Sequence, residues 1–247
     1  MNFLIENNPG IKTRLFLWDT YGTQQGGFKN YRFLFDKAYT FDRDDATKYN
    51  LEYFPDFYVP VQEKSSTIFD LSFVGTANPD DTIHRLDLMD YVFKFCESNK
   101  LKTFLYLKVN RPQKRTFNPF KMLKRKIWPS HYVKLLNKYK EQPWLHFEPI
   151  SLQECNLKQS QAKVLLDLNH RDRQGMTINC ITALANGQKL ITTNKRIREE
   201  SFFNPNMIYI LDEDNPQLDI NFWDKPFAKI ELSSQKIDNW LFKILND

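Results

Sequence analysis

One short stretch, residues 163–168 (Lys-Val-Leu-Leu-Asp-Leu), constrains the fold more than any other part of the chain. It is nearly all apolar, which is typical of a strand buried on both faces of a parallel sheet. A loop at 169–175 and a helix at 176–186 are expected to follow, with Gly187 as the residue that ends the helix. This order predicts an α/β fold in which helices cross over between parallel strands in the right-handed sense.

The same alternation of strands and helices runs through the rest of the chain. Between residues 61 and 67 the sequence is polar and without periodicity, so we place a boundary there. Residues 1–62 are interpreted as a partial N-terminal α/β domain, with strands at 14–18, 37–41 and 51–59 and a short helix capped by Asp42. Residues 68–247 are interpreted as a C-terminal Rossmann-like domain, whose last helix, 233–245, is expected to pack back onto the body. Its other strands are expected at 69–74, 101–109, 144–148, 189–193 and 207–211, and its other helices at 80–98, 131–140 and 152–161.

Positive charge is concentrated in one part of the chain. Residues 98–140 contain no Asp or Glu, although the net charge of the whole chain is only +5. This stretch is either a solvated basic face or a surface for an anionic partner. Within it, residues 117–128 combine aromatic side chains with Lys121, Lys124, Arg125 and Lys126. This segment is either a packed basic helix or a peripheral contact with an anionic membrane surface.

The cysteines and the apolar runs bear on where the protein resides. The three cysteines have no paired spacing, so neither a disulfide framework nor a zinc knuckle is indicated. No apolar run approaches the length of a membrane span, and the first residues do not resemble a signal peptide. We therefore expect a cytoplasmic protein, with peripheral contact at the inner face of the cell membrane as an alternative.

The loop between the apolar strand and the following helix is the strongest candidate site. Ligands of open α/β sheets bind beyond the carboxyl ends of the strands, and helix N-termini bind phosphate. In residues 169–177, His170 lies within the loop, Arg173 could neutralise a diphosphate, Gly175 permits close approach and Thr177 offers a hydroxyl. The alternative is an ordinary strand-to-helix turn. The dinucleotide fingerprint and the P-loop motif are both missing from the sequence, which argues against a nicotinamide dehydrogenase and a P-loop ATPase.

Three blocks together resemble a known family. They are 69–77 (Phe-Asp-Leu-Ser-Phe-Val-Gly-Thr-Ala), 165–177 (Leu-Leu-Asp-Leu, then His170 and Gln-Gly-Met-Thr) and 183–194 (Ala-Leu-Ala-Asn-Gly-Gln-Lys-Leu-Ile-Thr-Thr-Asn). The combination is similar to bacterial lipopolysaccharide-core and capsule glycosyltransferases of the two-domain GT-B type. The resemblance implies a nucleotide-sugar donor, a glycolipid or glycan acceptor, and no cofactor or metal. The donor-binding residues that we assign, from the resemblance and from the strand ends, are Gly75, Thr76, Glu148, His170, Arg173, Gln174, Gly175, Met176, Thr177 and Asn194.

The sequence also departs from that family. Thr182 stands where related chains carry an acidic residue, Asn179 stands where many carry Arg, and residues 1–60 correspond to only the closing part of an N-terminal domain. A second hypothesis is therefore a catalytically inactive relative that acts as a binding protein. A nucleic-acid-binding protein is the weakest hypothesis, because no recognition module accompanies the basic residues. No catalytic residue is assigned from the sequence.

Overall fold

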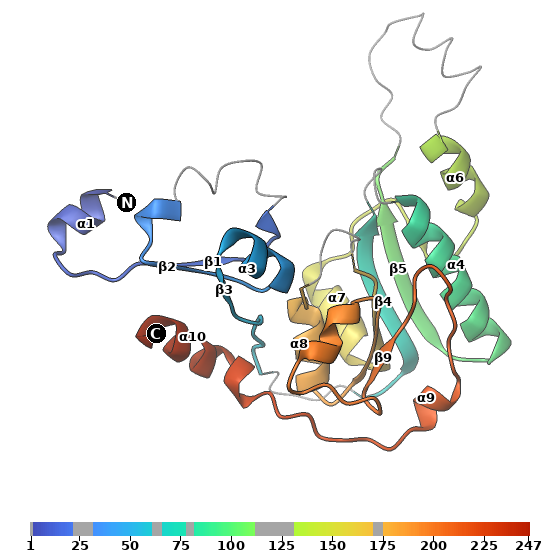
Figure 1. The fold of residues 1–247 in the computed structure, drawn as a ribbon. Helices are drawn as coiled ribbons and strands as arrows, with labels where there is room; N and C mark the ends of the chain where they lie inside the picture. The colour runs from blue at the N-terminus through green and yellow to red at the C-terminus, as the bar shows by residue number, and fades with distance from the viewer. Residues whose placement is uncertain (1, 22–31, 61–65, 78–81, 112–130, 170–174) are drawn as a thin grey trace, which may run out of the picture.

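The computed structural model describes residues 2–21, 32–60, 66–77, 82–111, 131–169 and 175–247. They form two parallel sheets, shown in Figure 1. The strands are β1 (Arg14–Leu17), β2 (Lys37–Thr40), β3 (Glu52–Tyr53), β4 (Phe69–Ala77), β5 (Thr103–Val109), β6 (Leu145–His146), β7 (Ala162–Asp167), β8 (Lys189–Thr192) and β9 (Ile208–Ile210). The α/β class with parallel strands, as expected from the sequence, is confirmed.

Helices and short 3-10 turns connect the strands. The helices are α1 (Asn2–Asn7), α3 (Arg43–Tyr49), α4 (Thr82–Ser98), α6 (His131–Tyr139), α7 (Leu152–Ser160), α8 (Ile178–Ala185), α9 (Asn221–Asp224) and α10 (Ile237–Asn246). The 3-10 turns are η2 (Arg32–Leu34), η3 (Lys195–Glu199) and η4 (Ser233–Gln235). Among these residues, no helix combines the length and the apolar composition that crossing a bilayer requires.

The larger sheet has the strand order β6-β5-β4-β7-β8-β9. Counted from β4, this is the order 3-2-1-4-5-6 of the doubly wound Rossmann fold. After β4 the chain builds the sheet outward in one direction, and from β7 onward it builds the sheet in the other. The sheet therefore has a topological switch point between β4 and β7.

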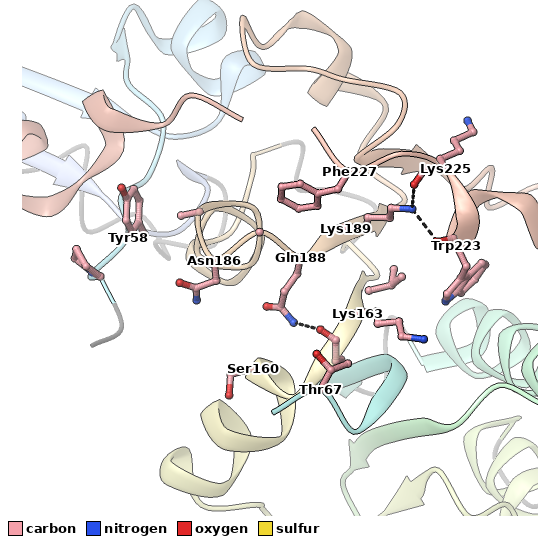
Figure 2. A pocket seen from close by; sticks show the side chains of 15 residues that line it. Tyr58, Thr67, Ser160, Lys163, Asn186, Gln188, Lys189, Trp223, Lys225 and Phe227 are labelled. Carbon is pink, nitrogen blue, oxygen red and sulfur yellow. Dashed lines mark hydrogen bonds between the residues drawn. The ribbon is translucent and has the colours of Figure 1, made fainter. Parts of the chain in front are cut away.

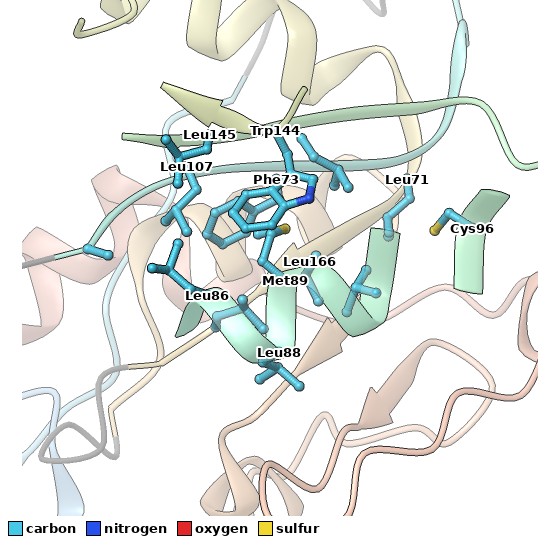
Figure 3. Close-up of a cluster of buried hydrophobic side chains, with 14 of the residues drawn as sticks. Leu71, Phe73, Leu86, Leu88, Met89, Cys96, Leu107, Trp144, Leu145 and Leu166 are labelled. Atoms are coloured by element: carbon cyan, nitrogen blue, oxygen red, sulfur yellow. The ribbon is translucent and has the colours of Figure 1, made fainter. Parts of the chain in front are cut away.

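Hydrophobic side chains fill both faces of the larger sheet. On one face, α4 and α6 cover a cluster that includes Phe73, Met89 and Trp144, all almost fully buried (Figure 3). On the other face, α8 covers a second cluster that includes Leu165 and Leu190, and α7 packs against β4 and β7. Alternate residues of β7 belong to different clusters, which explains why its sequence is apolar throughout.

The smaller sheet, β1-β2-β3, has a core of its own on each face. Leu17, Ala38 and Leu51 are buried on one face. On the other face, Tyr39 and Phe57 pack against Trp240 and Ile244 of α10, the last helix of the chain. In Figure 1 this helix lies beside the smaller sheet, at the end of a long C-terminal segment. The division of the chain at residues 61–67 remains a prediction, but the last helix packs on the N-terminal sheet and not on the larger one.

Ion pairs hold the N-terminal part against the larger sheet. Arg43 of α3 forms a salt bridge of 2.9 Å with Glu200, and the Tyr53 hydroxyl donates a hydrogen bond of 2.6 Å to the same carboxylate. Arg196 of η3 pairs with Asp44 of α3 at 2.5 Å. The Glu200 side chain is only 8% exposed, so this contact is a packed interface between the two parts of the chain.

Candidate functional site

A cleft of about 450 Å³ lies at the switch point between β4 and β7. Crevices of this kind, beyond the carboxyl ends of the strands, are where doubly wound sheets bind ligands. The larger sheet contributes the ends of both strands, and α8 contributes Ile178 and Asn179 at its first turn. The N-terminal part closes the other side with Trp18, Phe41 and Asp56. The site is therefore composite, built from both parts of the chain.

Arg85 of α4 provides fixed positive charge in this cleft. Its guanidinium donates hydrogen bonds to the carbonyl oxygens of Thr76, at 2.6 Å, and Leu168, at 2.7 Å. These two carbonyls lie at the carboxyl ends of β4 and β7, on the two sides of the switch point. Arg85 thus joins the two strand ends and brings a cation to the place where they diverge. The sequence analysis did not identify this residue, because it precedes the switch point on a helix and belongs to no motif.

The α8 helix presents its N-terminus to the same cleft. The helix begins at Ile178, two residues later than expected, because the Thr177 side chain acts as the N-cap and accepts from the Cys180 amide. Within the described part of the chain, the amides of Ile178 and Asn179 donate to no acceptor. Free amides and the positive end of the helix dipole favour an anion. The predicted phosphate-binding feature therefore begins at Ile178, two residues after Met176, and Met176 itself is buried in the core.

Gly175 lies directly under an aromatic ring of the N-terminal part. A Cβ atom at this position would lie 2.3 Å from the Phe41 ring and 2.8 Å from the Phe41 carbonyl oxygen. The absence of a side chain at Gly175 therefore accommodates Phe41. The sequence suggested that a phosphate could approach Gly175 closely. On that side of the turn the Phe41 ring fills the space, so the amides of Ile178 and Asn179 are the groups left for an anion.

Gly75 is part of strand β4 and not of a turn after it, contrary to the sequence prediction. It pairs with Leu107 in the parallel ladder, and the strand continues to Ala77. A Cβ atom on Gly75 would lie 2.5 Å from the Phe73 ring, so packing within the strand explains the glycine. Gly75 and the exposed Thr76 nevertheless line the cleft, as expected for residues at this strand end.

Two carboxyl groups line the cleft, and the sequence analysis identified neither. Asp167, the last residue of β7, accepts a hydrogen bond of 2.8 Å from the Thr192 hydroxyl, and burial raises its pKa. Asp56 is 4% exposed, and its Oδ1 atom has no hydrogen-bond partner. Burial raises the pKa of Asp56 to about 7. The signal available in the sequence was a single Asp within the apolar run Phe54-Pro55-Asp56-Phe57-Tyr58.

A second cavity, of about 420 Å³, continues from this cleft along α8. The two share the lining residues Gln159, Leu165, Ile178 and Asn179, so they adjoin, and we refer to them together as the groove. Polar side chains along the second cavity come from α7, from α8 and from the turn after it, and Val59 and Pro60 bound it on the N-terminal side. The polar lining residues are Asn156, Gln159, Ser160, Asn179, Thr182, Asn186 and Gln188. Thr182, the residue that replaces an acidic one in the family resemblance, therefore lies in the groove.

Several predicted site residues lie elsewhere. Glu148 follows the edge strand β6, pairs with Arg111 at 3.0 Å and is largely exposed, and it does not line the groove. Asn194 is buried, and its side chain caps η3 by accepting from the Arg196 amide at 2.9 Å. His170, Arg173 and Gln174 lie outside the described residues, as do Lys121, Lys124, Arg125 and Lys126.

Another cavity, of about 630 Å³, lies at the opposite end of the larger sheet, beside the first residues of β7 and β8 (Figure 2). Its buried polar groups are used by the protein itself. Lys189 donates to the carbonyl oxygens of Phe222, Trp223 and Lys225 at 2.8–2.9 Å. Gln188 donates to the carbonyl oxygens of Gln159 and Ala162. This cavity is therefore a weaker candidate than the switch-point groove.

The fold and the groove define a doubly wound α/β protein with a cleft at its switch point. No protein-family model and no curated protein matches the chain. Among solved structures, the chain is similar to a Glycosylation Associate Protein (Gap123) complex from Streptococcus agalactiae, with a TM-score of 0.39 and 13% sequence identity. The match covers 99% of this chain and 48% of that chain, so this chain spans about half the length of the matched one. A likeness of this strength carries no argument about function.

Proposed function

We propose that the chain is a glycosyltransferase that binds a nucleotide-sugar donor in the switch-point groove and transfers the sugar to a glycan of the lipopolysaccharide or capsule type. The observation that carries the proposal is the pair of unbonded amides, at Ile178 and Asn179, in a cleft at the β4–β7 switch point.

The charges around the first cavity favour a diphosphate. Two amide donors and the helix dipole of α8 attract an anion, and the Arg85 guanidinium adds a full positive charge. Asp56 and Asp167 oppose this attraction when they are ionised. Because burial raises the pKa of both carboxyls, their neutral forms are favoured and the repulsion is reduced.

The second cavity suits the nucleoside. Carboxamides of Asn156, Gln159 and Asn186 both donate and accept hydrogen bonds, as ribose hydroxyls and base edges require. In Thr182 a hydroxyl replaces the carboxylate that the resemblance would place beside the ribose. We therefore expect a weaker hold on the ribose than a carboxylate would give.

A binding protein without transferase activity is the second candidate. Two observations favour it: Phe41 covers Gly175, and Thr182 lacks a charge. In this reading the groove still binds a nucleotide sugar, but no sugar is transferred. An acceptor and an anionic membrane surface as partners remain predictions in both readings.

The first experiment measures binding of UDP, GDP, ADP and their sugar conjugates by calorimetry and by thermal shift. We expect stabilisation that grows with ligand concentration. Ile178→Pro removes one amide donor at the first helical position, where proline is tolerated and the extended Thr177 backbone can precede it. The matched control is Ile178→Ala, which keeps the amide and loses the side chain.

We expect the affinity of Ile178→Pro for the bound nucleotide to be roughly tenfold lower than that of Ile178→Ala, since the lost bond is to a charged group. Equal affinities would show that the α8 amides do not hold the phosphate, and lack of binding by every nucleotide would refute the proposed function. Release of nucleoside diphosphate in the presence of glycan acceptors separates the two candidates. Binding without such release supports the binding protein.

A further inference from the structure

Asp56 is an unusual residue in the part of the chain that the structure describes. It is a nearly fully buried carboxylic acid whose Oδ1 atom has no partner, and it lines the cleft that contains the α8 amides. Leaving a buried polar atom unpaired costs free energy, so each such atom calls for an explanation. A ligand oxygen in the cleft would provide the missing partner.

The backbone around Asp56 is held by hydrogen bonds to η4 and α10. The Trp240 indole donates to the Pro55 carbonyl oxygen at 2.8 Å. The Tyr58 amide donates to the Gln235 carbonyl oxygen, and the Ile237 amide donates to the Tyr58 carbonyl oxygen. These bonds on both sides of Asp56 in the sequence fix the backbone of the segment, and the Asp56 residue that it carries is 4% exposed and lines the cleft.

We propose that Asp56 binds the donor as a neutral carboxylic acid, donating a hydrogen bond to a phosphate or sugar oxygen of the nucleotide sugar. This inference rests on the proposed function and adds to it a residue that contacts the ligand. The neutral acid is a donor, whereas its ionised form is only an acceptor and would repel a phosphate. Binding is therefore expected to be coupled to the uptake of a proton.

The other charged groups around Asp56 do not supply an alternative partner. Those that line the cleft are Arg85, which is bonded to two carbonyl oxygens, and Asp167, which accepts from Thr192. On η4 and α10, behind the segment, the charged side chains are Lys236 and Asp238, which pair at 3.3 Å, and Lys243, whose Nζ lies over the Phe54 ring. α7 and α8 contribute the uncharged Gln159 and Asn179.

The test measures binding of UDP-glucose, GDP-mannose and ADP-glucose to the full chain by calorimetry at pH 6, 7 and 8. A nucleotide sugar is a suitable probe because its two phosphate charges do not change over this range. With the pKa of Asp56 at about 7, affinity should fall about tenfold from pH 6 to pH 8. At pH 7, titration in two buffers of different ionisation enthalpy should show uptake of about half a proton.

Asp56→Asn keeps the size and the donor but does not titrate, and Asp56→Ala removes the donor. We expect Asp56→Asn to bind about as tightly as the wild type at pH 6, to keep that affinity at pH 8 and to take up no proton at this site. Asp56→Ala should bind about tenfold more weakly at pH 6. The thermal unfolding of each variant is measured first, so that a loss of binding is not confused with a loss of structure.

The outcomes separate this inference from the proposed function. If a nucleotide sugar binds and Asp56→Asn shows the same pH dependence and proton uptake as the wild type, the inference fails while the donor site stands. If affinity rises with pH in the wild type alone, Asp56 acts as an ionised acceptor and the inference is also wrong. If no nucleotide sugar binds to the wild type or to Asp56→Asn at any pH, both proposals fall together.

Discussion

At Gly175, a single missing side chain decides how the two parts of the chain meet. The space beside its Cα is filled by the Phe41 ring and by the Phe41 carbonyl oxygen. The ring can rotate away from an added methyl group, but the carbonyl oxygen belongs to the backbone and moves only with the strand end that carries it. The contact therefore fixes the position of the turn that precedes α8.

Gly175→Ala is expected to lower the free energy of unfolding by about 1–3 kcal/mol, because overpacking forces the backbone to shift. Urea denaturation measures the change. Phe41→Ala and the double variant complete a mutant cycle, in which we expect the cost of the alanine to be smaller when the ring is absent. An unchanged stability of Gly175→Ala would show that Phe41 does not rest on this turn.

Individual residues were predictable where local chemistry determines them. Asp42 caps α3 by accepting from two amides, and Gly187 ends α8 with a φ of 79°, both as expected. Asp56 was not predictable, because its burial depends on residues that follow it by about 180 positions in the chain. Gly75 was misplaced for a related reason, since its pairing with β5 extends the strand beyond the point where a turn was expected.

Among the elements, α10 is the one on which the smaller sheet depends. Three short strands bury too little apolar surface to be stable alone. The Trp240 ring contacts the rings of Phe16, Phe54 and Phe57, with ring centroids 4.8–5.8 Å apart. Its indole N–H donates a hydrogen bond to the Pro55 carbonyl oxygen. The helix thus supplies Trp240 and Ile244, two of the four buried residues on this face, together with the partly buried Ile237.

Trp240→Ala is expected to destabilise the smaller sheet by about 3–5 kcal/mol, the usual cost of deleting a buried aromatic side chain. Hydrogen exchange should show faster exchange of the amides of β1, β2 and β3, with the larger sheet affected less. Phe242→Ala on the same helix is the control, because Phe242 is 69% exposed, and we expect a change within about 0.5 kcal/mol. Equal effects of the two variants would contradict the role given to Trp240.

Most strands and helices of the larger sheet follow from hydrophobic patterns, and their order in the chain indicated parallel pairing. The order of strands in space did not follow from the sequence, because every parallel arrangement uses the same apolar strands. Only the structure identifies the switch point between β4 and β7, and only from it does the role of Arg85 become visible. The start of α8 lies within two residues of the position expected from the sequence.

For the molecule as a whole, the ion pairs around Glu200 link the N-terminal part of the chain to the larger sheet. Glu200 receives hydrogen bonds from Arg43 and Tyr53 and is largely shielded from water. No motif predicted this contact, since Arg43 and Tyr53 precede Glu200 by about 150 residues in the chain.

Glu200→Gln is expected to lower the free energy of unfolding by about 1–3 kcal/mol, because it leaves the partly buried Arg43 without its nearest counter-charge. This cost is smaller than for a fully buried pair, because the Arg43 side chain is 30% exposed. Limited proteolysis should then cleave the N-terminal part sooner. Glu199→Gln is the matched control, because Glu199 is more exposed and lies 3.9 Å from Arg43, and its effect should be within about 0.5 kcal/mol. If both variants resist proteolysis like the wild type, the link is not important for docking.

The return of α10 to the first sheet also bears on how the chain matures during translation. The ribosome makes β1, β2 and β3 before the larger sheet, but the helix that completes their core follows almost 200 residues later. The larger sheet has its own core, which is complete once Leu232 has emerged. The smaller sheet therefore precedes the larger one in synthesis but is completed after it.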